Sequence, residues 1–414
     1  MIAFVLYAVA CPLVLLALAA CLYQVAAAVA AHILPNTASP TPGEPYTDFA
    51  IVIPAHNESG VLQSALQSCA RIDYPDELYA VYVIADNCDD DTARIAAAGG
   101  ARLLVRRTDR EFGKGFALQW ALPQVLERDH AAVVVLDADC QLNRQSLRVF
   151  DGELRQGRQV IQAAYRVANP DDTGMTYLQG LALFVEDRFF YLAKSSLGLA
   201  VLLQGTGMVF DRAVLTAHPW HATSLTEDTE YSCRLLRAGV PITFTCRATV
   251  TTSCPVAVAA LSVQRARWVF GAVQVVKREA WPLLRDGVRL RRLQVFDAGW
   301  TLLLLSRPLL CAELILAAAA AALCRFVAPG PLSTLLIGGV VAAAGLYLAY
   351  GLAAVIAFGL TWRRCRLLLE LPWNIMRYSA IALRGVIQRP VTWRRTPRAE
   401  DEWATARRLS GNRP

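Results

Sequence analysis

An uninterrupted apolar run that leads directly into two aspartates constrains this chain more than any other stretch. Residues 132–136 (AVVVL) are apolar and rich in β-branched side chains, and Asp137-Ala138-Asp139 follows without a break. Such a run is typical of a strand buried on both faces of a parallel sheet. Because open α/β folds bind ligands at the carboxyl ends of such strands, we expect Asp137 and Asp139 at a ligand-binding edge.

The two carboxylates supply the hard oxygen ligands that Mg²⁺ or Mn²⁺ prefers, with waters and substrate oxygens completing the coordination. Once the chain turns after the strand, both can reach one divalent ion and the phosphates that it bridges. The alternative is a turn with two solvated acids, and the pair alone does not exclude it. The surrounding sequence favours the metal site.

Strand-like and helical stretches alternate through the middle of the chain. The predicted strands are residues 49–54, 81–85, 101–106, 132–136 and 206–211. Helices are expected to open at residues 55–58, after the acids at 89–91, and at residues 111–115. This alternation predicts a doubly wound α/β sheet.

Polar residues stand at successive strand ends. They are Asn57 and Glu58 after Pro54, Asp86, Lys114 between two glycines, and the aspartate pair. Singly, Asn57 could be an N-cap, Asp86 a turn residue, and the Gly-Lys-Gly segment is neither a Walker loop nor a dinucleotide fingerprint. Together they would meet on one edge of the sheet.

Two further clusters lie closer to the C-terminus. Glu227 and Asp228 follow Thr226, a natural N-cap, so helix capping competes with catalysis as their purpose. One of these acids could act as the base that deprotonates an acceptor hydroxyl. Residues 264–268 (QRARW) stand on a predicted helix, where paired Arg and a Trp suit phosphate binding and stacking on a flat ligand.

Three apolar segments frame this region, and 55 % of the residues are hydrophobic. No Lys, Arg, Asp or Glu precedes Glu44, and the first segment exceeds the roughly 20 residues needed to span a bilayer. A signal peptide is the alternative, but the missing basic n-region and the overlong apolar run argue against it. We expect the following divisions: transmembrane helix 1–34, Pro-rich linker 35–48, α/β domain 49–254, interfacial helices 255–297, transmembrane helices 298–325 and 332–360, and basic tail 361–414.

The basic residues predict the orientation. Arginines cluster at 289–292 and 363–366, whereas only Arg325 lies between the last two apolar segments. By the positive-inside rule, the α/β domain and C-terminus are cytoplasmic and the N-terminus is outside. The tail holds 12 Arg and 4 acids, which suits membrane lipids better than nucleic acid. The 11 cysteines lack metal-site spacing and are expected to be reduced.

Taken in order and spacing, Asp86, Asp137-Ala-Asp139, Thr226-Glu-Asp228 and Gln264-Arg-Ala-Arg-Trp268 resemble the four signatures of membrane-bound family 2 glycosyltransferases with the GT-A fold. That family includes cellulose, chitin, hyaluronan and poly-N-acetylglucosamine synthases and ceramide glucosyltransferase. The resemblance covers about residues 49–268 and the arrangement of one leading and two trailing apolar segments.

The resemblance implies a role for each matching position. Nucleoside binding falls to Asp86 with Pro54, Asn57, Glu58 and Lys114, and the nucleoside is usually uridine. Asp139 would ligate the Mg²⁺ or Mn²⁺ ion, and Asp137 would contact the ribose or nucleotide. Asp228, beside Glu227, would be the general base. Arg265 and Arg267 would hold the diphosphate, and Trp268 with Gln264 would bind the acceptor.

The function that it implies is an inverting hexosyltransferase that moves a sugar from a nucleotide sugar, such as a UDP-sugar, to a β-linked extracellular polysaccharide or oligosaccharide. The alternative is transfer of one sugar to a lipid such as ceramide or diacylglycerol, and a third is a non-catalytic scaffold. Three spans form a narrow path, so a processive enzyme would need export or assembly subunits, or oligomerisation.

Three further features leave part of the functional assignment open. The motif after the second strand reads Asp86-Asn-Cys-Asp-Asp-Asp91 rather than Asp-Asp-Gly-Ser, which leaves open which acid meets the base. Arg307 and Glu313 lie in an apolar segment, where ionisable groups are commonly functional, although an Arg near the end can also snorkel. Residues 391–394 (VTWR) faintly resemble a gating loop of cellulose synthase or are ordinary basic tail.

Overall fold

A computed structural model describes residues 2–34, 44–221, 224–255, 258–304 and 307–387, with the backbone alone at 258–266, 307–309, 378 and 381–387. One eight-stranded sheet forms the centre of the α/β domain, in the order β3-β2-β1-β4-β7-β6-β8-β5. The strands are β1 (Phe49–Ala55), β2 (Tyr79–Asp86), β3 (Arg102–Arg106), β4 (Ala132–Val135), β5 (Cys140–Leu142), β6 (Val160–Val167), β7 (Met208–Asp211) and β8 (Thr243–Thr252).

The sheet has a parallel half and a mixed half. Strands β3, β2, β1 and β4 are parallel, whereas β7 is antiparallel to both β4 and β6. The predicted alternation of strand and helix therefore holds for the first half of the domain, and the reversal at β7 gives the mixed sheet of the complete domain. The parallel half brings the carboxyl ends of β1, β2 and β4 to one edge.

Helices cover both faces of the sheet. The shorter helices are α2 (Leu62–Cys69), η1 (Asp76–Leu78), α3 (Thr92–Ala98), α4 (Lys114–Leu126), α5 (Ser146–Arg155), α7 (Leu192–Ser196), α8 (Arg212–Ala217) and α9 (Glu227–Ala238). Alternate residues of β1 explain the two layers, because side chains along a strand point to opposite faces. Ala50 and Val52 pack with α4 and α9, while Ile51 and Ile53 pack with α2 and α5.

Two long helical runs connect this domain to the apolar helices. The first comprises α6 (Gly174–Val185), the π-helical segment η2 (Glu186–Tyr191) and α7. The second comprises α10 (Val258–Val275), the π-helical segment η3 (Val276–Ala280) and α11 (Trp281–Arg289). The remaining helices are α1 (Ile2–Ile33), α12 (Leu293–Leu304), α13 (Arg307–Val327), α14 (Pro331–Phe358), α15 (Trp362–Leu369) and α16 (Leu371–Ile387).

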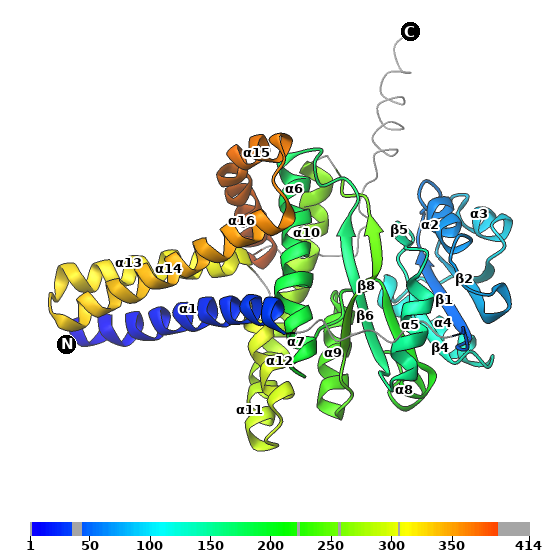
Figure 1. Cartoon of the computed structure of the whole chain (residues 1–414), viewed down its shortest axis with the longest axis horizontal. Coiled ribbons are helices and arrows are strands. Elements are labelled where there is room, and N and C mark those ends of the chain that lie inside the picture. Colours follow the sequence, from blue (N-terminus) through cyan, green and yellow to red (C-terminus); the bar gives the residue numbers. More distant parts are fainter. Residues whose placement is uncertain (1, 35–43, 222–223, 256–257, 305–306, 388–414) are drawn as a thin grey trace, which may run out of the picture.

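Three of these helices are long and apolar enough to cross a membrane. They are α1, residues Leu310–Val327 of α13, and α14. They lie side by side and project from one side of the α/β domain, with helices α11, α12, α15 and α16 around their base (Figure 1). The hydroxyl of Tyr7 donates to the carbonyl of Ala328 at 2.7 Å, which joins α1 to the end of α13.

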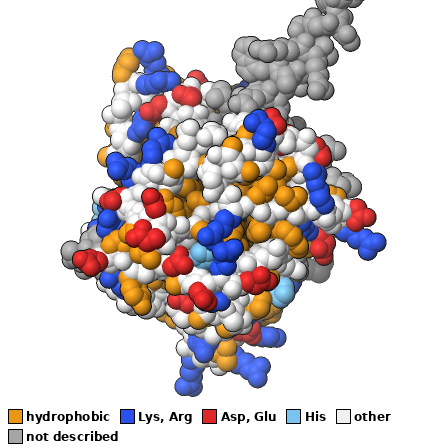
Figure 2. Space-filling view, turned by 90° about the vertical axis from the view of Figure 1, so that its right-hand side faces the viewer, with side chains coloured by type: hydrophobic (Ala, Val, Ile, Leu, Met, Phe, Trp, Pro, Cys, Tyr) orange, Lys and Arg blue, Asp and Glu red, His pale blue; other side chains and the backbone are white. Residues whose placement is uncertain are grey.

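The opposite side of the molecule has a different surface. Figure 2 shows acidic and basic side chains around hydrophobic side chains that are exposed in the middle of this face. By contrast, the long helices expose large apolar side chains such as Phe4, Leu335 and Leu348. This difference matches an α/β domain in water that is joined to helices in an apolar medium.

The structure corrects two of the predicted boundaries. The helix expected to open at residues 55–58 begins only at Leu62, because Ala55 still belongs to β1 and Asn57 has a positive φ of 54°. The apolar segment expected from residue 298 is divided between α12 and α13. Its first part packs on the α/β domain, since Asp297 and Thr301 are buried beside Lys194. The side chain of Arg307 and the whole of residues 391–394 lie outside the described residues, while Glu313 is partly buried on α13.

Candidate functional site

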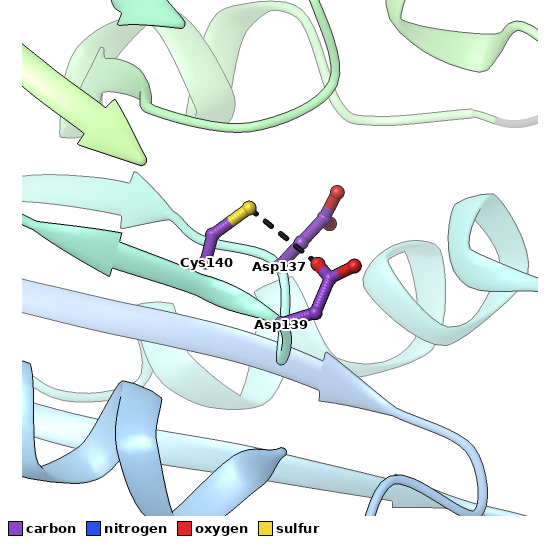
Figure 3. A group of neighbouring side chains, drawn as sticks. All are labelled: Asp137, Asp139 and Cys140. Carbon is purple, nitrogen blue, oxygen red and sulfur yellow. Dashed lines mark hydrogen bonds between the residues drawn. The ribbon is translucent and has the colours of Figure 1, made fainter. Parts of the chain in front are cut away.

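Asp137 and Asp139 lie together just beyond the end of β4. One ligand atom from each, with the sulfur of Cys140, falls within a group whose atoms are all within 4.8 Å of one another. The two carboxylates lie side by side, and the thiol of Cys140 contacts Asp139 at 3.5 Å (Figure 3). Burial and the two aspartates raise the pKa of Cys140 well above its usual value, which keeps the thiol protonated. The oxygen donors therefore suit a hard divalent ion, with the sulfur as a packing group.

Lys114 links this strand end to the neighbouring loop. It is the first residue of α4, where Gly113 precedes it with a φ of 116°. Its ammonium group contacts the carboxylate of Asp137 and donates to the carbonyl of Gly205 at 2.5 Å. Burial alone would lower the pKa of Lys114, but the charges of Asp137, Glu227 and Asp228 outweigh it and raise that pKa. A cation is thus held at the centre of three carboxylates.

Glu227 and Asp228 begin α9 on the other side of Lys114. Thr226 occupies the N-cap position as expected, but its side chain makes no capping hydrogen bond. Asp228 accepts a hydrogen bond from the backbone N–H of Thr229 at 2.7 Å. Burial and the adjacent Asp228 raise the pKa of Glu227 to about 7, and burial also raises that of Asp228. Two neighbouring acids with raised pKa values in a cavity are a candidate proton-transfer site.

Gly205 allows the backbone to approach this acid pair. Its φ is 86°, and a Cβ atom there would lie 3.2 Å from the Oδ2 atom of Asp228 and 3.6 Å from the Nζ atom of Lys114. Any larger residue would therefore be strained and would crowd both side chains. Gly207 has a similar restriction, because its Cβ atom would lie 2.5 Å from Val250.

Asp86 stands at the end of β2 in a buried ion pair that the sequence analysis did not foresee. Its Oδ1 atom lies 2.7 Å from Arg106, the last residue of β3, and both side chains are about 6 % exposed. The register pairs these residues directly across the two parallel strands. Since one carboxylate oxygen is held by Arg106, the other can point toward a ligand. An Arg at the end of the next predicted strand was the available signal.

The residues that follow β1 are hydrogen-bonded to the residues that follow β2. Asn57 is not an N-cap, because its side-chain oxygen accepts from the backbone of Asp89 at 2.8 Å. The backbone N–H of Glu58 donates to Thr92 at 2.8 Å. Pro54 lies within β1, paired with Ile84. These residues shape the loop next to Asp86.

The predicted QRARW segment lies on α10, opposite α9. Arg267 and Trp268 line the same cavity as Lys114, Asp137, Glu227 and Asp228. For Gln264 and Arg265 the structure describes the backbone on α10, and their side chains lie outside the described residues. The predicted residues therefore fall into a cavity group around Lys114 and a group at the ends of β1 and β2. Asp139 lies just beside the cavity lining.

The cavity extends far beyond the acids. Its volume is about 1250 Å³, and it continues from Lys114 and Asp228 to α14 and α16. There its walls include Tyr347, Leu348, Tyr350, Gly351, Leu352, Val355 and Ile375. We call this part, lined by α14 and α16, the apolar arm. Sequence analysis missed it because neither apolar periodicity nor motif spacing shows which helices enclose a cavity.

Comparison with known proteins places these features in context. Residues 45–271 match the model of the glycosyltransferase like family 2. The beta-monoglucosyldiacylglycerol synthase of Trichormus variabilis is 27 % identical over 193 residues, 45 % of this chain and 40 % of that protein. A probable glucomannan 4-beta-mannosyltransferase of Arabidopsis thaliana is 24 % identical over 258 residues, 59 % of this chain and 46 % of that protein. The chain thus spans less than half the length of these curated relatives.

The fold itself also has a solved counterpart. The mannosyltransferase PcManGT from Pyrobaculum calidifontis, in complex with GDP-Man and Mn²⁺, superimposes with a TM-score of 0.59 at 19 % identity. The match covers 93 % of this chain and 99 % of that one, so it includes the long helices as well as the sheet. With more than half of its residues described by the family model, the chain belongs to the glycosyltransferase like family 2 and has the GT-A fold.

Proposed function

We propose that this protein transfers a sugar from a nucleotide sugar to a lipid acceptor whose tail lies in the apolar arm. One observation carries the proposal, namely that the acids around Lys114 and the apolar side chains of α14 and α16 line a single cavity. An acceptor with a polar end and an apolar tail would place its hydroxyl beside Asp228 and its tail among membrane helices. Burial of such a tail is favourable by about 25 cal/mol per Å² of apolar surface.

The donor would bind along the edge formed by β1, β2 and β4. Asp86, held by Arg106, would meet the base, and the Asp137–Asp139 pair would hold Mg²⁺ or Mn²⁺ together with the diphosphate. When bound, the metal would supply positive charge against the negative charge that develops on the leaving diphosphate. Arg267 reaches the cavity from α10 and would act on the same phosphates.

Acceptor activation falls to the acid pair at the start of α9. In the ionised state, Asp228 would take the proton from the acceptor hydroxyl as that oxygen attacks the anomeric carbon from the side opposite the diphosphate. The displacement inverts the anomeric centre, so an α-linked donor gives a β-linked product. Lys114 balances the charge of Asp137 and lowers the cost of gathering three carboxylates.

A polysaccharide or oligosaccharide product is the second candidate. Aromatic side chains in the cavity favour it, because Trp268, Phe270 and Tyr347 offer flat faces on which sugar rings could stack. The two relatives named above also divide between a glycolipid and a polysaccharide by name. The lipid acceptor is favoured here because the walls of the arm beyond these aromatics are largely aliphatic.

Two glycine substitutions on α14 test the lipid acceptor. A Cβ atom at Gly351 or at Gly345 would meet no heavy atom within 4 Å, yet only Gly351 is among the cavity-lining residues that the structure describes. Gly351→Leu would therefore fill the arm, whereas Gly345→Leu adds the same side chain elsewhere on the helix. Both changes should stabilise α14, because Gly is about 1 kcal/mol less favourable in a helix than Ala, and Leu ranks close to Ala.

The purified protein would be incubated with UDP-glucose, UDP-N-acetylglucosamine or GDP-mannose, with and without diacylglycerol or ceramide. We expect one sugar to be added only when lipid is present. Gly351→Leu should lower this transfer at least about tenfold and leave donor hydrolysis unchanged, and Gly345→Leu should behave as the natural protein. A ladder of oligosaccharides formed without lipid would overturn the lipid acceptor in favour of the second candidate.

The proposed topology places the α/β domain in the cytoplasm. Helices α1, α13 and α14 would cross the membrane, and α11, α12, α15 and α16 would lie at its surface. Exposed apolar side chains on these surface helices fit the headgroup region, among them Trp281, Leu293, Trp362 and Leu369. Donor and metal are then both taken from the cytoplasm.

A further inference from the structure

The π-helical segment η2 carries two consecutive acids that lie in different environments. Glu186 lines the cavity and is partly exposed to it, while Asp187 is fully buried. Asp187 accepts hydrogen bonds from the backbone of Tyr165 at 2.9 Å and from the side chain of Gln204 at 3.4 Å. Burial raises the pKa of Asp187 well above its usual range, although Arg166 opposes this. Asp187 therefore serves the structure, whereas Glu186 faces the cavity.

The segment η2, which carries Glu186, lies between the acid pair and the apolar arm. On one side, the contact from Asp187 to Gln204 places η2 next to Gly205, whose Cβ position is 3.2 Å from Asp228. On the other side, Phe189 of the same segment packs against Tyr350 of α14, with ring centroids 5.8 Å apart. An acceptor that extends from Asp228 into the arm would therefore pass along η2, where Glu186 faces the cavity.

The side chains around this position are suited to hydroxyl groups. Tyr165, Gln179 and Gln204 line the cavity together with Glu186, and each can donate or accept a hydrogen bond. Three cations stand among the described lining residues, and the charge of Glu186 also acts on the buried Lys194. Lys114 is held by Asp137, and Arg267 stands on α10 with the proposed phosphate group. Lys277 lies about 15 Å farther along that helical run and is exposed.

We propose that Glu186 selects an uncharged, hydroxyl-bearing lipid headgroup and rejects acceptors that carry a phosphate. This inference rests on the lipid acceptor proposed above. A carboxylate accepts hydrogen bonds from hydroxyl groups and repels a phosphate at the same place, so one side chain both favours the first class and excludes the second. Glu186 is thus a specificity residue, and the proton transfer remains with the acids of α9.

The test compares two acceptors in the same detergent micelles, namely diacylglycerol and a polyprenyl monophosphate. The variants are Glu186→Gln, which keeps the shape, and Glu186→Lys, which reverses the charge. Arg188→Gln is the matched control, because Arg188 belongs to the same π-helical segment and is exposed. Donor hydrolysis without any acceptor, measured with UDP-glucose and GDP-mannose, checks that each variant is folded and binds the donor.

We expect the natural protein to prefer diacylglycerol. Glu186→Gln should lower kcat/KM for diacylglycerol by about tenfold, because the amide oxygen still accepts a hydrogen bond but without the added strength of a charged acceptor. Glu186→Lys should shift the preference toward the phosphate by at least as much. Arg188→Gln should change neither value.

Two failures can be told apart. If neither lipid accepts sugar while the donor is still hydrolysed, the lipid acceptor itself is wrong and the role of Glu186 falls with it. If a lipid is glycosylated but the natural protein prefers the phosphate, or Glu186→Lys leaves the preference unchanged, the lipid acceptor stands and the selection by Glu186 is overturned.

Discussion

Lys194 and Asp297 form an ion pair in which Nζ and Oδ2 are 2.9 Å apart and both side chains are almost fully buried. Lys194 comes from α7 of the α/β domain and Asp297 from α12. The hydroxyl of Tyr23 on α1 donates to the same carboxylate. Burial lowers the pKa of Lys194 to about 8, although Asp297 opposes the change. One buried pair therefore joins the catalytic domain, a surface helix and the first apolar helix.

Replacing one partner of this pair should destabilise the protein strongly. Lys194→Met leaves the carboxylate of Asp297 buried without its cation, which typically costs about 3–5 kcal/mol. We expect a lower midpoint of thermal unfolding in detergent. Lys194→Met combined with Asp297→Leu should recover much of the loss. The exposed pair Arg94–Asp91 is the control, and Arg94→Ala should leave the midpoint unchanged. Equal midpoints for Lys194→Met and the natural protein would contradict this role.

The proposed metal site predicts a selective loss of donor chemistry. Asp139→Asn should lower metal-dependent donor hydrolysis and transfer by about 10²- to 10³-fold, because a metal supplies several kcal/mol of charge stabilisation. EDTA should inactivate the natural protein, and Mn²⁺ or Mg²⁺ should restore it. Asp129→Asn serves as the control, since Asp129 is fully exposed and precedes β4 at the opposite edge of the sheet. Full activity of Asp139→Asn would remove this residue from the site.

The proposed base predicts a different pattern. Asp228→Asn keeps the size of the side chain but removes its basicity, so transfer should fall by about 10²- to 10⁴-fold. Donor affinity, measured by calorimetry with the free nucleotide diphosphate and Mn²⁺, should change little. A comparable loss of donor affinity would mean that Asp228 supports the fold of the site and does not accept the proton.

The raised pKa of Glu227 predicts the pH dependence. Protonation of the acid pair removes the base, so kcat/KM for transfer should rise with pH and level off above about 7. Because the folded chain holds this proton more tightly than the unfolded chain, the contribution of Glu227 to the free energy of unfolding should decrease from its ordinary pKa of 4.5 up to about 7. Glu227→Gln should move the acidic limb of the rate profile to lower pH. An unmoved limb would assign the titration to another group.

Reporter fusions test the topology. A reporter after Pro414 should be cytoplasmic, and one inserted between α13 and α14, at residues 328–330, should be outside. Each fusion would be read with a pair of reporters that are active on opposite sides of the membrane. Both positions on one side would disprove the three-span arrangement and the cytoplasmic location of the α/β domain.

Local sequence signals predicted the parallel half of the fold well. The apolar run of β4 ends at the aspartate pair because strand burial and sheet termination are encoded within a few residues. The same holds for α9, where Thr226 marks the helix start. The local signals failed where contacts between distant segments decide how a helix packs. Thr301 belongs to the apolar stretch expected from residue 298, yet its contact with Lys194 and that of the preceding Asp297 place α12 against the α/β domain.

Local sequence also predicts one part of the candidate site, while distant segments decide the other part. Carboxylates at strand ends can be read from the sequence, but the Arg106 partner of Asp86 depends on the register between β2 and β3. Glu186 lies on a π-helical turn in the middle of a long helix, and no residue pattern predicted that turn. The apolar arm requires α16 to meet α10 and α14 to meet α6, which only tertiary packing decides.

The contact between Tyr7 and Ala328 has a consequence for the order in which the protein assembles during its synthesis. These residues are 321 positions apart in the chain. At about 5–20 residues per second, a ribosome needs roughly 15 to 65 s to make the intervening segment. In the proposed topology, α1 therefore waits in the bilayer without its neighbours while the whole catalytic domain is synthesised. Gln24, almost completely buried in the finished protein, therefore lacks its later helical neighbours during that interval.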